Sequence, residues 1–291
     1  MGSYTSILSP QRYYNIFSKI WSLRLAALSK ITITMFLITL LIFSYSLVPI
    51  QAHIFTSNES ASFISLVDQI KSALIAISGN NSSNIDAIKE QTGYAKALLN
   101  DSMVKEIHEK NQRLATELPR ALDSLQNMSE EELNSNITNL LDLLSETINA
   151  RVQKDRLENT TVQALAVAGD VDKIFSEYSS AYNKSVTGMD MNMSMNMSMT
   201  PDNESSMEVP KDIQAYDRAL AFADITIDRF NTELKGKSEN ISSAQGALSG
   251  LEQLRNAMHN KEPPGNLLGI VHGQIHPNLQ TAYGLELAGT M

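Results

Sequence analysis

The chain has 291 residues, a formal charge of −9 at neutral pH and no cysteine, which excludes disulfides, thiolate metal sites and cysteine nucleophiles. Residues 1–52 contain four basic residues and no acidic ones, so the rest of the chain carries a charge of −13. Nucleic acid is therefore excluded as a partner, because an acidic surface repels phosphate. Stability must come from a hydrophobic core.

Residues 31–50 form a long apolar run without charged side chains. About 20 such residues in a helix cross a bilayer core of about 30 Å, so residues 31–52 are predicted to be a transmembrane or signal segment. The basic leader, 1–30, is expected in the cytoplasm and everything after Ala52 outside the cell, in the pseudoperiplasmic space. The small residue Ala52 after Pro49 also permits cleavage, which would release a secreted chain beginning at His53.

Asparagines in N-x-Ser/Thr sequons are frequent beyond residue 57. Twelve of the 23 asparagines begin such a sequon, more than the Ser and Thr content would give by chance, so a glycosylated extracellular surface is predicted. The alternative is that a surface rich in Ser and Asn generates sequons by itself. The sequon asparagines are Asn58, Asn80, Asn81, Asn100, Asn127, Asn136, Asn159, Asn183, Asn192, Asn196, Asn203 and Asn240.

Apolar residues after Ser57 recur mainly at helical spacing, and no stretch sustains the period-two alternation of a half-buried strand. The sequence predicts an all-α fold, an antiparallel bundle or pair of bundles of six to eight helices. Pro119 is expected to kink or break one helix, and Ser129 with Glu132 to form a capping box at the start of another. The expected parts are a first half at 53–184, a flexible loop at 185–210 and a second half at 211–291.

Six methionines alternate with small polar residues in the loop. Thioether sulfur is a soft ligand that selects Cu(I), and a flexible strand-like segment can bring several sulfurs to one ion. The run resembles the Met-x-Met segments of copper transporters and exported copper-resistance proteins, a resemblance that covers about eleven residues and implies copper binding. The alternatives are low-complexity drift, an oxidant sink or a glycosylated linker. The candidate ligands are Met189, Met191, Met193, Met195, Met197 and Met199.

His272 and His276 lie four residues apart in a predicted turn bounded by Gly273 and Pro277, where two imidazoles suit copper or zinc. The plain alternative is that His276 caps a helix and His272 packs in a loop. His53, if it became the N-terminus, would chelate Cu(II) through its amine and imidazole. The Ala52–His53 junction resembles the start of mature copper monooxygenase subunits, which implies a possible histidine brace but, since those families are mostly β-sandwiches, no fold.

These features predict a membrane-attached extracellular protein that binds copper for acquisition, storage or delivery, with a copper-dependent membrane protein as a possible recipient. The composition resembles exported proteins of ammonia-oxidising archaea. No catalytic motif is present, so binding is favoured over turnover. The alternatives are a glycosylated surface or sensor protein without metal and, further off, a histidine-brace oxidase. The copper-binding and metal-free alternatives make different predictions: copper binding requires the fold to bring His272 and His276 near His53 or near the methionine loop.

Overall fold

The computed structural model describes residues 55–56, 58–78, 84–182 and 209–286. They belong to one compact unit, Ala52–Met291. The described residues are helical, with no strand beyond a single bridge residue at Phe55, which confirms the all-α prediction. The leader, the apolar segment, His53, the six loop methionines and the sequons at Asn80, Asn81, Asn183, Asn192, Asn196 and Asn203 lie outside the described residues.

Five helices enclose the first hydrophobic core. It is built from their buried Leu, Ile, Val and Ala side chains. The helices are α2 (Glu59–Ser78), α3 (Ile85–Leu98), α4 (Asp101–Lys110), α5 (Gln112–Ser124) and α6 (Glu130–Arg151).

The second core is formed by the helices that follow the short α7 (Lys154–Leu157). Besides aliphatic side chains it buries tyrosines and phenylalanines. Its elements are α8 (Thr160–Ala181), α9 (Ile213–Arg229) with the π-helical η2 (Phe230–Leu234), α10 (Ile241–His259), α11 (Pro264–Ile270), the π-helical η3 (Val271–Ile275) and α12 (His276–Tyr283).

Local capping signals explain most helix starts. The predicted capping box is present: the Ser129 side chain accepts from the Glu132 amide, and the Glu132 carboxylate accepts from the Ser129 amide at 3.1 Å. Of the kink or break expected at Pro119, the break does not occur. Pro119 lies inside α5, and the chain breaks at Asn111, which ends α4 and caps α5 by accepting from the Leu114 amide. An Asx side chain that satisfies free amides competes with the continuing helix.

The predicted turn around His272 is also wrong. Residues 264–283 form one helical run, in which η3 joins α11 to α12. Pro277 has no amide hydrogen to donate to the preceding turn, and a π-helical stretch just before it accommodates this loss.

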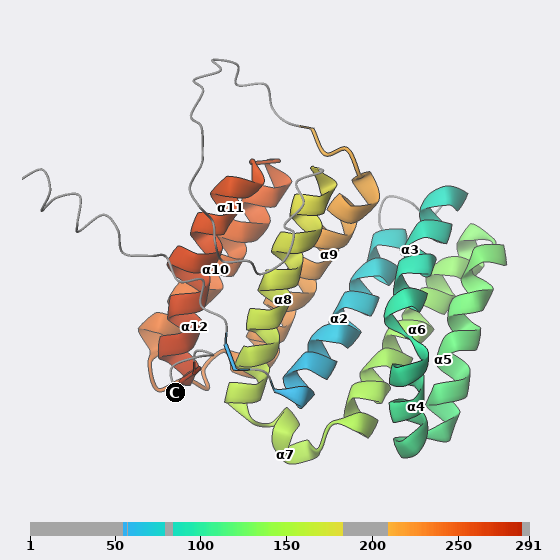
Figure 1. The fold of residues 1–291 in the computed structure, drawn as a ribbon, viewed down its shortest axis with the longest axis horizontal. Helices are drawn as coiled ribbons and strands as arrows, with labels where there is room; N and C mark the ends of the chain where they lie inside the picture. The colour runs from blue at the N-terminus through green and yellow to red at the C-terminus, as the bar shows by residue number, and fades with distance from the viewer. Residues whose placement is uncertain (1–54, 57, 79–83, 183–208, 287–291) are drawn as a thin grey trace, which may run out of the picture. The chain divides into compact units, whose positions relative to one another are not determined.

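The two cores meet along α2, which contacts α3 and α6 on one side and α8 and α9 on the other (Figure 1). α8 contributes to both cores: Val162 and Ala166 belong to the first, while most of its other buried apolar residues pack with α9–α12 in the second. Among the described helices, α2 has the length and apolar composition that crossing a membrane would need. Most of α2 is buried inside the protein, however, as expected of a core helix.

Candidate functional site

His272 and His276 are brought together in the second bundle. His272 belongs to η3 and His276 begins α12, and their rings lie 5.3 Å apart between centroids in an edge-to-face arrangement. His276 is buried, with 1% of its surface exposed. Its Nε2 lies 3.3 Å from a carboxylate oxygen of Asp172 on α8. The Phe55 ring packs edge-on against His276, with 5.3 Å between centroids.

Close packing of α10 holds this pair in place. A Cβ atom added at Gly250 would lie 2.8 Å from Cγ1 of Ile275, and one added at Gly246 would lie 2.6 Å from the Asn278 amide oxygen. Only glycine allows α10 to approach η3 and α12 so closely. The N-terminal segment is fixed beside them, since the Thr56 amide donates to the Glu286 carbonyl at 2.9 Å.

Two imidazoles provide nitrogen donors of the kind that Cu(II) and Zn(II) accept, and the Asp172 carboxylate lies beside one of them. Within the described residues, however, no three His, Asp or Glu side chains are arranged to hold a metal ion. A complete site therefore needs a further ligand. His53 precedes Phe55 by two positions, and two residues of chain span at most about 7 Å.

The ends of the methionine loop are tied together at the far end of α8. The amides of Lys211 and Asp212 both donate to the Ala181 carbonyl, at 2.7 and 3.0 Å. Asp172 lies ten residues before Tyr182, about 15 Å along the helix axis. The point where the loop leaves the bundle is thus separate from the histidine pair. His108 and His259 are exposed at helix ends and do not join the pair.

Four sequon asparagines have a structural role that their pattern alone did not reveal. Each stands at the start of a helix, where its side-chain oxygen accepts a hydrogen bond from a backbone amide of the first turn. Helix capping therefore explains why an asparagine occupies these positions. The Ser or Thr that completes each sequon lies in the same first turn. Their side-chain Nδ2, the atom that carries an N-glycan, takes no part in the cap. These asparagines are Asn58, Asn100, Asn159 and Asn240.

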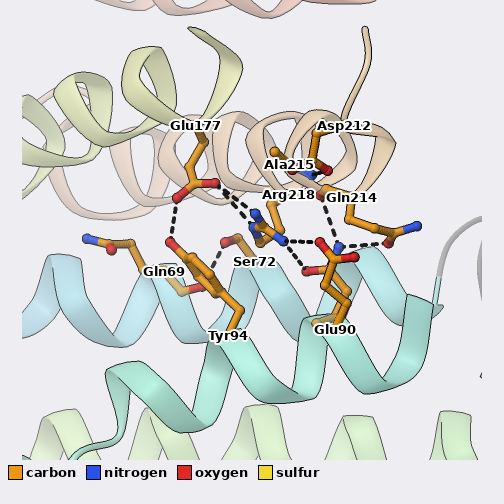
Figure 2. Close-up of polar contacts among 10 residues, drawn as sticks. Gln69, Ser72, Glu90, Tyr94, Glu177, Asp212, Gln214, Ala215 and Arg218 are labelled. Atoms are coloured by element: carbon orange, nitrogen blue, oxygen red, sulfur yellow. Dashed lines mark hydrogen bonds and ion pairs between the residues drawn. The ribbon is translucent and has the colours of Figure 1, made fainter. Parts of the chain in front are cut away.

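Buried polar side chains form a layer between helices of the two cores. At one end of this layer, the contacts are arranged around Arg218 (Figure 2). From α9, Arg218 donates to Glu177 on α8 at 3.2 Å and to Gln91 on α3 at 3.1 Å. Its guanidinium lies 4.2 Å from the centre of the Tyr94 ring, whose hydroxyl donates to Glu177 at 2.7 Å. Gln91 in turn donates to Gln214. This network joins three helices from both bundles.

A second cluster lies further along the same layer. Arg229 on α9 binds Asp68 on α2, with Nε donating to Oδ2 at 2.7 Å, and donates to Gln163 on α8 at 3.0 Å. Asp68 and Asp170 on α8 are both fully buried. The sequence carried one signal for this cluster, since Asp68 interrupts the apolar α2 next to the buried Val67. It did not reveal which helices meet there.

Comparison with protein-family models, with curated proteins and with solved structures gave no match.

Proposed function

We propose that this protein is an extracellular, membrane-attached copper-binding protein, in which His272 and His276 bind Cu(II) and the methionine loop binds Cu(I). Acquisition, storage or delivery of copper is the role that fits a chain without a catalytic motif. A copper-dependent membrane protein would be its recipient. The leader and residues 31–52 would attach it to the membrane, or release it by cleavage after Ala52.

The observation that carries the proposal is the pairing of two imidazoles, one of them buried, beside the segment that follows His53. A histidine pair with one buried member at a π-helical stretch is more than a helix cap, since π-bulges inside helices are frequent at functional sites. The Asp172 carboxylate is suited to orient the His276 ring, as carboxylates near metal-bound imidazoles do. His53, through its imidazole and, after cleavage, its amine, is the proposed further ligand.

Competitive titration tests the proposed Cu(II) site and the proposed Cu(I) site. The chain beginning at His53 would be titrated with Cu(I) and Cu(II) against chelators of known affinity. We expect Cu(II) binding to fall at least tenfold in His272→Ala and in His276→Ala, since each removes one ligand. Cu(I) binding should be lost when the six loop methionines are changed to leucine.

His259→Ala is the matched control, because His259 is an exposed histidine at the end of α10. Its Cu(II) affinity should equal that of the parent chain. Equal affinities in all the histidine variants would remove His272 and His276 from the site, and failure of the parent chain to bind either ion would refute the proposal.

A glycosylated surface protein without a metal is the second candidate. It is favoured by the four sequon caps, whose Nδ2 atoms are left available. Mass spectrometry of the native protein would test it, with glycan expected on Asn100, Asn159 and Asn240, the exposed caps. Glycan together with copper binding would mean that the two proposals describe one protein.

A further inference from the structure

Asp68 and Asp170 form an unusual pair in the layer between the cores. Both side chains have 0% of their surface exposed, one on α2 and the other on α8. Oδ1 of Asp68 and both carboxylate oxygens of Asp170 are buried without a hydrogen bond of normal geometry, and Ser65 makes only a weaker hydrogen bond with Asp170. Buried polar atoms are nearly always satisfied, so three such oxygens in one cluster need an explanation.

The charges around the pair are divided unequally. Asp68 has Arg229 as its partner, and Lys71 on its own helix lies 3.8 Å from Oδ1. Asp228 on α9 also faces Lys71. The Arg229 guanidinium is already used by Asp68 and by Gln163. Burial raises the pKa of Asp68 as well, but Arg229 and Lys71 oppose that shift and supply the cations that an ionised carboxylate needs. Asp170 has no ion pair of its own among the described residues.

We propose that Asp170 is buried as a neutral carboxylic acid, and that its proton acts as a latch between the two bundles: losing the proton loosens the contact of α8 with α2. A protonated Asp170 supplies a donor for a buried oxygen of the cluster. Deprotonation transfers the proton to solvent and leaves a second negative charge in a buried layer whose Arg229 guanidinium is already occupied. A buried charge without a partner is costly, and admitting water between the helices relieves it.

The electrostatic surroundings agree with this assignment. Burial, followed by the negative charge of Asp68, raises the pKa of Asp170 to about 8, against offsets from Arg229 and Ser65. Because the ordinary pKa is 3.8, the folded chain holds a proton that the unfolded chain has released between about pH 4 and pH 8. The contribution of Asp170 to the free energy of unfolding is therefore largest below about pH 4, decreases as the pH rises from about 4 to about 8, and no longer changes above about pH 8.

Two measurements on the full chain in detergent, free of metal, test the latch. Burial also raises the pKa of Asp172 to about 7, so the infrared measurement is made in an Asp172→Asn background. There the carbonyl band of a protonated carboxyl group should be present at pH 6, disappear near pH 8 and be absent once Asp170→Asn is added. Urea unfolding from pH 5 to pH 9 should show the unfolding equilibrium constant of the parent rising by up to about tenfold per pH unit within the window. The same dependence should be much flatter in Asp170→Asn, which should be the more stable protein at pH 8.

Asp142→Asn is the control, because Asp142 is exposed on α6. It should keep both the infrared band and the pH dependence of the parent. If Asp170→Asn fails to fold, the band in the Asp172→Asn chain decides the question alone. Absence of the band at pH 6, or an unchanged pH dependence in a folded Asp170→Asn, would overturn the proposal. Neither measurement involves copper, so the latch stands or falls independently of the proposed function.

Discussion

At the scale of single residues, the described structure depends on a few buried charges. Arg218 is 7% exposed and joins α9 to α8 and α3 through Glu177 and Gln91. Arg229 does the same between α9, α2 and α8. Such groups give directional contacts where two apolar surfaces would otherwise slide, but removing one partner leaves the others buried and unsatisfied.

Arg218→Met should therefore lower the free energy of unfolding by about 2 to 4 kcal/mol, because Glu177 and Gln91 lose their donor while the volume stays similar. Urea unfolding at pH 7 measures it. Arg255→Met is the comparison, since the pair of Arg255 with Asp224 is 42% and 51% exposed and should cost less than about 1 kcal/mol. Equal losses in the two variants would mean that the buried network adds nothing to stability.

At the scale of elements, the histidine pair depends on how closely α10 lies against η3 and α12. Gly250 has Ile275 where its own side chain would be, so the glycine is required by packing although it weakens the helix. Gly93 on α3 offers the contrast, since a Cβ atom there would meet nothing within 4 Å.

Gly250→Ala should accordingly destabilise the protein by about 1 to 3 kcal/mol, as overpacked side chains do, and should weaken Cu(II) binding by displacing η3. Gly93→Ala should stabilise it by about 0.5 to 1 kcal/mol, the usual gain in helix propensity. Thermal unfolding and copper titration of both variants are the measurements. A stabilised Gly250→Ala with unchanged copper affinity would show that the close approach is not needed.

At the scale of the whole described unit, α2 belongs to one core and packs against the helices of the other. The two bundles share this helix and the polar layer beside it. We expect them to unfold together rather than as independent domains.

Leu122→Ala tests this expectation, because Leu122 is fully buried in the first core, far along the chain from α10. Its cavity should cost about 2 to 5 kcal/mol, and hydrogen exchange should report the same loss for protected amides of α10 in the second core. Unchanged protection in α10, with faster exchange confined to α3–α6, would instead indicate two separate folding units.

The sequence by itself determined the helical class, the apolar stripes and the capping box at Ser129, because periodicity and capping act between residues a few positions apart. It also identified His272 and His276 as a pair. It misplaced the break at Pro119 and the turn at Gly273, where neighbouring caps and a π-helical stretch outweighed the usual effect of proline and glycine.

Only the tertiary structure decided that Phe55 lies against His276, that α8 packs mainly with the second core, and that Asp68, Asp170 and Arg229 lie in a buried layer. These partners are about 60 to more than 200 positions apart along the chain. Their meeting depends on which helix faces pack together, and that choice is made by the summed burial of many side chains rather than by any local pattern.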